Sequence, residues 1–334
     1  MKLEKRNLAA QTVNRRRFLS LATGGVLFPY AAFSIRAQFQ KPIQEHASNN
    51  RRLNPQGWDP TTLTASWIGH STVLMNFFGT TILTDPVLTE KVGIDVLGLF
   101  VYGPQRITPP ALTFEELPPL EVILISHAHM DHMDLRTLDR FDRSMPVVVA
   151  ANTGDILEDQ GFTNVLELDW GKSIEIKDVT IEALQVKHNG ARFPWEHARS
   201  KGSEDGRSCN AYLLSKSNVH AVFAGDTAYC EYFKPLRDRF PSIDLAIMPI
   251  GGYDPWENNH ATPEQSVLMC KQMGARVILP VHWQTFVSTS ESVLEPIERL
   301  KAALVNETIK IALDDIGEVW SLGEERPPDR TPGD

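Results

Sequence analysis

The sequence VILISHAHMDH occupies residues 122–132. Its first part, 122–126, is an apolar run with β-branched residues, which is typical of a buried strand. Its second part has the spacing H-x-H-x-D-H and follows that strand as a loop. Three imidazoles and a carboxylate so close together are costly to bury alone, whereas neutral imidazole and carboxylate are natural metal ligands. The stretch therefore predicts a metal site at the end of a buried strand, formed by His127, His129, Asp131 and His132.

The composition is that of an ordinary globular chain. It has 334 residues, 42% hydrophobic and 22% charged, which is enough for a large core. The net charge is -9, and residues 1–37 carry seven basic side chains and one acidic one, so the remainder carries -15. An acidic body of this kind is a poor match for DNA or RNA, so we expect no nucleic-acid partner.

The N-terminus reads as a targeting segment. Residues 14–20, NRRRFLS, resemble the twin-arginine export signal, and a charge-free stretch follows from Phe18 to Ile35. Residues 1–37 are therefore predicted to be a signal segment, with the twin-arginine export machinery as a partner and a periplasmic or exported protein as the product. Glycine and proline dilute the apolar stretch, and both cleavage near Ala37 and an uncleaved membrane anchor remain open.

The remaining chain divides into three parts. Residues 38–60 are polar and are interpreted as a linker, residues 61–322 as one globular domain, and residues 323–334 as a disordered tail. A meander of strands comes first and alternating strands and helices come later, which predicts an α/β fold of two sheets covered by helices. Helices are expected at Leu135–Phe141, Gly154–Gln160, Cys230–Phe240, Pro263–Met273 and Ser292–Val305.

Three further candidate ligands stand where predicted strands end. His188 follows Thr180–Val186, Asp226 follows a strand ending at Ala224, and His282 follows Val277–Val281. Taken singly, a histidine in such a place is usually a hydrogen-bonded surface residue, and a Gly-Asp pair is usually a turn. Because strand ends at one edge of a sheet converge, the repeated placement predicts that these residues meet the H-x-H-x-D-H loop.

The ordered ligand set resembles that of the metallo-β-lactamase superfamily, and the resemblance covers about Thr61 to Leu322. It implies a four-layer αβ/βα sandwich that binds two divalent ions. One ion would be held by His127, His129 and His188 and the other by Asp131, His132 and His282, with Asp226 bridging them. The nitrogen-rich set favours zinc (Zn2+), with manganese or iron as alternatives.

Several motifs are similar to the branch of the superfamily that contains N-acylphosphatidylethanolamine-hydrolysing phospholipase D. They are WIGHST at 67–72, LTDP at 83–86, FAGDT at 223–227, MPIGGY at 248–253, HATPEQ at 260–265 and HWQTF at 282–286. The resemblance implies that His260 lies near the substrate phosphate. The chain departs from this branch in residues 189–210, so the wall that faces the substrate is expected to differ.

Two polar residues are candidates for supporting the ligands. Metal-binding imidazoles usually donate their second N–H to a carboxylate or a carbonyl, and Asp85 is predicted to be such a partner. His70 either lines the floor of the site or bonds a backbone carbonyl, and the second interpretation is favoured. The three cysteines form no C-x-x-C pair, so they are interpreted as buried thiols, with one disulfide as an alternative.

The resemblance implies a dinuclear metal-dependent hydrolase that uses a metal-bridging hydroxide. We expect Asp131 to orient this nucleophile and His260 to steady charge that develops on the substrate. A phosphodiesterase resembling the phospholipase, acting on a lipid or small-molecule substrate, is the favoured hypothesis. A lactonase or β-lactam-type hydrolase is the first alternative, and a non-catalytic metal-binding envelope protein is an alternative of another class.

Overall fold

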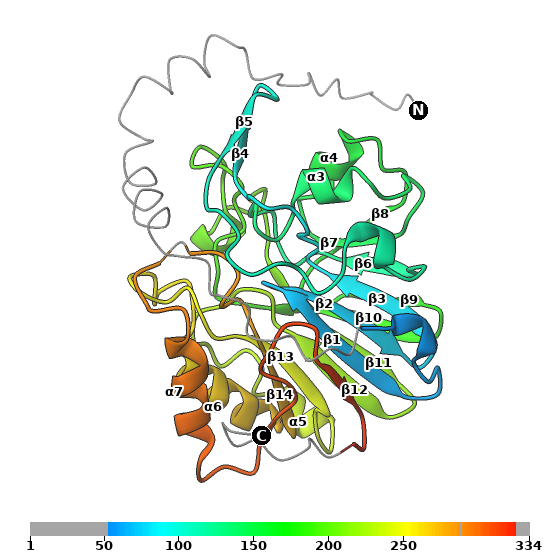
Figure 1. Cartoon of the computed structure of the whole chain (residues 1–334), viewed down its shortest axis with the longest axis vertical. Coiled ribbons are helices and arrows are strands. Elements are labelled where there is room, and N and C mark those ends of the chain that lie inside the picture. Colours follow the sequence, from blue (N-terminus) through cyan, green and yellow to red (C-terminus); the bar gives the residue numbers. More distant parts are fainter. Residues whose placement is uncertain (1–52, 288, 325–334) are drawn as a thin grey trace, which may run out of the picture.

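The computed structural model describes residues 53–287 and 289–324. The predicted signal segment, most of the predicted linker and nearly all of the predicted tail lie outside the described residues. Two seven-stranded sheets form the body of the molecule, and a separate two-stranded sheet projects from it (Figure 1). No helix among residues 53–287 and 289–324 is long and apolar enough to cross a membrane.

The first sheet has the strand order β16-β1-β2-β3-β6-β7-β8. Its strands are β1 (Leu63–Gly69), β2 (Thr72–Phe77), β3 (Thr80–Thr84), β6 (Val122–Leu124), β7 (Val147–Ala150), β8 (Val165–Leu168) and β16 (Val319–Ser321). Pairing is antiparallel from β16 through β3 and parallel from β3 to β8. Strand β16, which the sequence did not predict, closes this sheet against β1.

The second sheet repeats this arrangement with the order β15-β14-β13-β12-β11-β10-β9. Its strands are β9 (Ser173–Ile176), β10 (Val179–Gln185), β11 (Asn210–Lys216), β12 (Val219–Phe223), β13 (Leu245–Pro249), β14 (Val277–Val281) and β15 (Lys310–Ile311). Pairing is antiparallel from β9 to β12 and parallel from β12 to β15.

Alternation of side chains along the strands builds the layers. In β7, Val148 joins the core between the two sheets, whereas Val147 and Val149 face the other way and pack with Leu138 and Leu157 of the short helices outside. Strands buried on both faces need apolar residues at successive positions, which explains the continuous apolar runs. The predicted four-layer α/β sandwich is confirmed.

The helices lie outside the sheets (Figure 1). They are α3 (Leu135–Leu138), α4 (Asp155–Glu158), α5 (Leu236–Arg239), α6 (Pro263–Met273) and α7 (Glu295–Leu304), with single 3-10 turns η1 (Pro55–Gly57), η2 (Phe114–Glu116) and η3 (Arg199–Lys201). Helix α6 packs on β13 and α7 packs on α6. Thr262 caps α6 and Gly274 ends it in the left-handed conformation, as predicted.

Four of the five predicted helices are shorter than expected: α3 and α4 span only four residues each, and for the other two, α5 and α7, proline is the reason. The helix predicted for Cys230–Phe240 is only α5, because Pro235 lacks an N–H and restricts the residue before it. Helix α7 begins at Glu295 instead of Ser292, with Pro296 in its first turn, where proline is tolerated.

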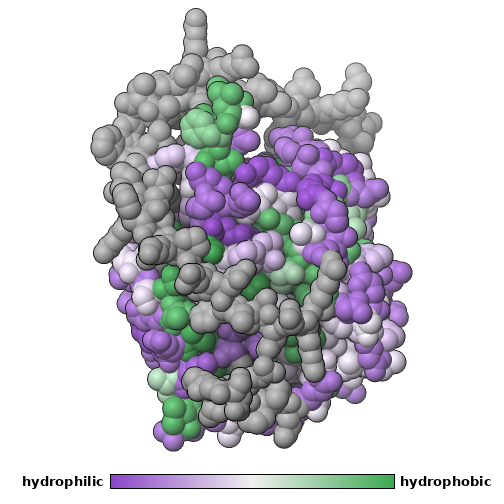
Figure 2. All heavy atoms as spheres, in the orientation of Figure 1, coloured by the Kyte–Doolittle hydropathy of each residue, from purple (hydrophilic) through white to green (hydrophobic). Residues whose placement is uncertain are grey.

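The two-stranded sheet is a projecting hairpin that the sequence did not predict. It consists of β4 (Ile94–Val96) and β5 (Phe100–Tyr102), and its turn places both Leu97 and Gly98 at positive φ. Leu97, Leu99 and Phe100 are exposed at its tip, which forms the apolar projection at the top of Figure 2. Leucine replaces the usual asparagine or aspartate of such a turn, so the short-range hairpin signal is missing.

Candidate metal centre

The predicted ligands stand immediately beyond the ends of strands. The H-x-H-x-D-H loop follows β6, and His188, Asp226 and His282 follow β10, β12 and β14. The structure brings all seven predicted ligands together in two adjacent clusters of ligand atoms, and a third, overlapping group joins His260 to Asp226 and His282. Their division between the two clusters is the one implied by the sequence resemblance.

The first cluster contains His127, His129, His188 and Asp226. His129 Nδ1 lies 2.8 Å from His127 Nε2 and 3.2 Å from His188 Nε2. The other ring nitrogens of His127 and His188 already have partners, since they lie 2.9 Å from Ser126 Oγ and 2.8 Å from the Asn259 carbonyl oxygen. Three ring nitrogens therefore face a common point.

The second cluster contains His70, Asp131, His132 and His282. His70 Nε2 lies 3.1 Å from Asp131 Oδ2, and His282 Nε2 lies 3.8 Å from the same oxygen. The favoured prediction for His70, a side-chain bond to a backbone carbonyl, is therefore wrong. His70 has φ of 52°, and this left-handed backbone turns its ring toward Asp131, while its own carbonyl accepts the His282 N–H.

Asp226 lies between the two clusters. Its Oδ2 atom is within 4.0 Å of five imidazole nitrogens, at 3.1 Å from His132 and 3.3 Å from His282 as the shortest. Its side chain is only 1% exposed. A single buried oxygen surrounded in this way has the position that a bridging ligand requires.

Asp85, the predicted partner of the ligands, is hydrogen-bonded to His132 and Ser126. Its Oδ2 atom accepts a hydrogen bond from His132 Nδ1 at 2.6 Å and another from the Ser126 hydroxyl at 2.6 Å, while Oδ1 accepts the Ser126 backbone N–H at 2.7 Å. Because the Ser126 hydroxyl donates to Asp85, its oxygen is free to accept the N–H of His127. One buried carboxylate thus orients an imidazole of each cluster.

Two glycines permit the close approach of these segments. A Cβ on Gly225 would stand 2.5 Å from Ser126 Cβ, and Gly225 has φ of 57°. A Cβ on Gly252 would stand 3.0 Å from His282 Cε1 and 3.1 Å from His260 Nδ1. The glycines of the FAGDT and MPIGGY motifs are therefore needed where backbone meets ligand side chains.

The imidazole pKa values of the first cluster move in the opposite direction to those of His132 and His282, whereas burial lowers the pKa of the second cluster's His70 to about 3. Burial, together with neighbouring imidazoles, lowers the pKa of His129 to about 3 and that of His127 well below its usual range. Burial also acts against protonation of His132 and His282, but Asp226 and Asp131 outweigh it and raise the pKa of His282 to about 9 and that of His132 further. Without a cation, the second cluster therefore holds protons at neutral pH.

Asp226 and Asp131 are ionised at neutral pH. Burial alone raises the pKa of each, but the neighbouring imidazoles, His132 foremost, lower both values well below the usual range. The centre thus combines anionic oxygens with imidazole nitrogens. This is the donor set expected of a divalent metal site.

Several buried polar atoms fit this interpretation because they lack hydrogen-bond partners within residues 53–287 and 289–324. They are His132 Nε2, both ring nitrogens of His282, His260 Nδ1 and Asp226 Oδ1. Such orphaned groups are costly in a protein interior unless something else satisfies them. The described residues therefore fit divalent metal ions, which would replace the protons of His132 and His282 and bind the Asp226 carboxylate.

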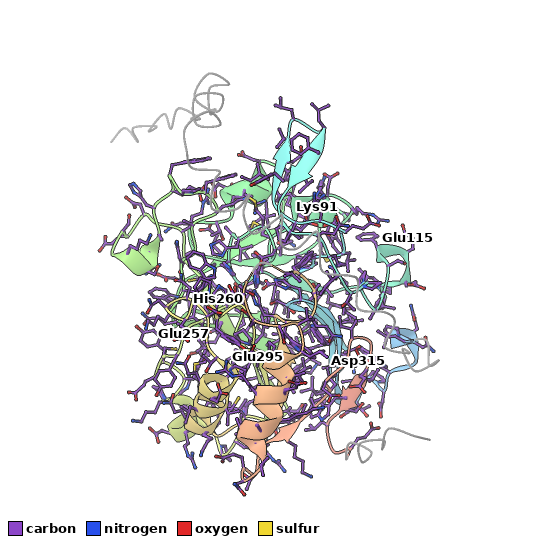
Figure 3. The ribbon with its side chains drawn as sticks, turned by 60° about the vertical axis from the view of Figure 1, so that its left-hand side comes forward. Lys91, Glu115, Glu257, His260, Glu295 and Asp315 are labelled. Atoms are coloured by element: carbon purple, nitrogen blue, oxygen red, sulfur yellow. The ribbon has the colours of Figure 1, made fainter. Side chains whose placement is uncertain are left out.

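His260 lies at the edge of the centre. Its ring is 16% exposed, and Nδ1 is 3.6 Å from Asp226 Oδ2. In Figure 3 it lies between the β4–β5 hairpin above and helix α7 below. Burial lowers its pKa well below the usual range, so the imidazole is neutral. The sequence placed His260 beside the substrate, and this position at the rim is compatible with such a role.

Apolar surfaces adjoin the second cluster. A hollow lined by His70 and His282 continues along Ile107, Phe286 and Pro296. On the segment that departs from the phospholipase pattern, Phe193 and Trp195 stack with ring centroids 4.7 Å apart, and Trp195 is 47% exposed. These aromatic rings are therefore surface features and not core.

Some supporting groups escaped the sequence analysis. Ser126 and the Asn259 carbonyl orient His127 and His188, yet a serine before the loop and a distant backbone oxygen carry no recognisable signal. The three cysteines are buried free thiols, as favoured, and the Cys209 thiol donates to the His188 carbonyl.

Comparison with known proteins identifies the family. Residues 80–283 match the model of the beta-lactamase superfamily domain. The chain belongs to the metallo-β-lactamase superfamily, and its fold and ligand set define a metal-dependent hydrolase.

Individual relatives refine this placement. The chain is 31% identical to N-acyl-phosphatidylethanolamine-hydrolyzing phospholipase D 1 of Caenorhabditis elegans over 78% of this chain and 76% of that protein. It is 32% identical to the mitochondrial enzyme of that name from Saccharomyces cerevisiae over 71% of this chain and 50% of that protein. Its fold is similar to an isothiocyanate hydrolase from Delia radicum gut bacteria, with a TM-score of 0.62, 17% identity and coverage of 78% and 99% of the two chains.

Proposed function

We propose that this protein is a zinc-dependent phosphodiesterase that hydrolyses a phospholipid-like diester. The observation that carries the proposal is the 31% identity to a phospholipase D over three quarters of both chains, together with the complete ligand set. The hollow beside His70 and His282 supports it, because Ile107, Phe286 and Pro296 place apolar side chains next to the second cluster, where an apolar part of a substrate could pack.

The residues divide the work between them. One ion would be held by His127, His129 and His188. The other would be held by Asp131, His132 and His282, and Asp226 would bind both ions. When bound, two divalent ions supply an ionised water as the nucleophile and a Lewis acid for the leaving oxygen.

Asp131 and His260 act at the open side. The Asp131 side chain is 33% exposed, compared with 1% for Asp226, so its ionised Oδ2 is the carboxylate oxygen available to orient the nucleophile. His260 is neutral and can donate an N–H to a phosphoryl oxygen. His260→Gln is expected to retain metal but to lower turnover about 100-fold.

The decisive assay measures turnover and metal content together. Zinc-loaded protein is expected to cleave bis(p-nitrophenyl) phosphate and N-acylphosphatidylethanolamine in micelles, and to lose activity on chelation. His129→Ala should lose metal and turnover with its circular dichroism unchanged, whereas His197→Ala, at an exposed histidine outside both clusters, should behave as wild type. Unchanged metal content and turnover in His129→Ala, or hydrolysis of lactones only, would overturn the proposal.

We also propose that residues 1–37 direct the protein to the periplasm by the twin-arginine route. The support is the NRRRFLS sequence and the apolar stretch that follows it. Replacing Arg15 and Arg16 together by lysine should leave the protein in the cytoplasmic fraction, while Arg36→Lys should not. Normal export of the double variant would contradict this route.

A further inference from the structure

A single arginine joins the divergent segment 189–210 to the metal-ligand loop. Arg192 Nη1 donates hydrogen bonds to the carbonyl oxygens of Ala128, at 2.8 Å, and Met133, at 3.0 Å. Ala128 stands between His127 and His129, and Met133 directly follows His132. One nitrogen therefore ties together the two ends of the loop that carries four of the seven ligands.

Hydrogen bonds and ion pairs formed by Glu196 and Arg207 hold the backbone of Arg192 in place. Glu196 Oε2 accepts the backbone N–H of Arg192 at 2.7 Å and that of Phe193 at 3.1 Å. The same oxygen lies 3.0 Å from Arg207 Nε, and Arg207 in turn forms a two-pronged contact with Asp155, the first residue of α4. The backbone at Arg192 is thus linked, through Glu196 and Arg207, to a helix of the first half of the molecule.

The charge of Arg192 strengthens both bonds. Burial lowers its pKa to about 10, while Asp134 and Glu196 act in the opposite direction, so the guanidinium is protonated at neutral pH. Hydrogen bonds from a charged donor are about twice as strong as neutral ones. Asp131 is also among the charges that act on Arg192, which places the cation near a ligand of the second cluster.

We propose that Arg192 is a positioning residue that fixes the curvature of the ligand loop and thereby sets the affinity of both metal positions. The loop lies between two fixed points, the end of β6 and helix α3, and Arg192 draws its ends toward one nitrogen. This inference rests on the metal centre and is independent of the substrate proposed above.

The test compares three variants of the full chain. Arg192→Met keeps much of the length and removes every donor, whereas Arg192→Lys keeps the charge but not the planar guanidinium. Arg199→Met is the matched control, because Arg199 lies in the same segment but pairs with Asp169 and stacks on Trp170. Affinity is measured by titrating Zn2+ or Co2+ into metal-free protein against a chromophoric chelator, together with the visible spectrum of the Co2+ form.

Arg192→Met is expected to bind metal about 10- to 100-fold more weakly and to change the Co2+ spectrum, as for other residues that orient ligands. The metal affinity of Arg192→Lys should lie between that of Arg192→Met and that of wild type. If Arg192→Met does not fold, Arg192→Lys tests the inference instead. Arg199→Met should keep wild-type affinity and spectrum. Wild-type affinity and spectrum in both Arg192 variants would overturn the positioning role of Arg192 but leave the metal centre standing. If the wild-type protein itself binds no ion, both the positioning role and the metal centre are overturned.

Discussion

The two ligand clusters share Asp226 but differ in the groups that hold their imidazoles. In the first, the outer nitrogens of His127 and His188 face neutral oxygens, a serine hydroxyl and a backbone carbonyl. In the second, His132 donates to the buried carboxylate of Asp85, and Asp131 stands close by. The chemistry of the supporting atoms therefore distinguishes two sites built from the same kinds of ligand.

This difference has an electrostatic consequence. The imidazoles of the first cluster have lowered pKa values and present free lone pairs at neutral pH. Those of His132 and His282 have raised pKa values because carboxylates surround them. The first position is ready for a cation, whereas the second must release protons before it can accept one.

The largest effect is expected from the residue that the clusters share. Asp226→Asn keeps the size of the side chain but removes the charge between the two positions. We expect both ions to be lost and turnover to fall more than about 100-fold, beyond the usual effect of losing an outer partner. Elemental analysis and kinetics measure this, with Asp244→Asn, a buried aspartate beside His220, as the control. Two ions bound at wild-type affinity in Asp226→Asn would contradict the shared role.

Asp85→Asn should affect metal binding at the two clusters to different extents. Asparagine tolerates the left-handed backbone at this position, where φ is 31°, but it removes the anionic acceptor of His132. Affinity for the second ion should fall about 10- to 100-fold, and affinity for the first should fall less because Ser126 intervenes. Stepwise metal titration followed by Co2+ absorption resolves the two events. Equal weakening of both ions is the result that would refute the distinction.

The pH dependence of metal binding should differ between the clusters. His282 has a pKa of about 9 in the metal-free protein, so below that pH an ion at the second position displaces its proton. Affinity there should rise up to about tenfold per pH unit between pH 7 and 9 for each proton displaced, one from His282 and one from His132, whose pKa is also raised. Affinity at the first position should be flat in that range, since its imidazoles are already neutral. Calorimetry in buffers of different ionisation enthalpy counts the released protons, and release at both steps would argue against the assignment.

The smallest effect is expected at the edge of the first cluster. The Cys209 thiol donates a weak hydrogen bond of 3.1 Å to the His188 carbonyl. Cys209→Ala should lower the free energy of unfolding by about 1 kcal/mol and weaken only the first ion slightly. Chemical denaturation and metal titration test this, and selective loss of the second ion would be inconsistent with the placement of Cys209.

The sequence predicts the ligands well because each one follows a strand. His127, His188 and His282 each follow an apolar run, so local patterns locate the ligands. The structure adds that these runs belong to two sheets, β6 to the first and β10 and β14 to the second. Helix α6 is likewise predicted because Thr262 and Gly274 cap it locally.

Features that depend on long-range contacts are not predictable in this way. Strand β16 has three residues and exists through its register with β1, in which Trp320 stands opposite Ala65. The orientation of His70 follows from its left-handed backbone conformation, which the residue type does not predict. Arg192 gives no signal, because its partners are two carbonyl oxygens about sixty residues away.

We propose that two clusters joined by Asp226 hold two ions that perform hydrolysis. The most direct measurement determines metal content and bis(p-nitrophenyl) phosphate turnover on the same purified sample, before and after chelation. We expect two ions per chain, hydrolysis that disappears on chelation, and recovery when zinc is returned. Fewer than one ion per chain after zinc loading, with no turnover, would contradict it.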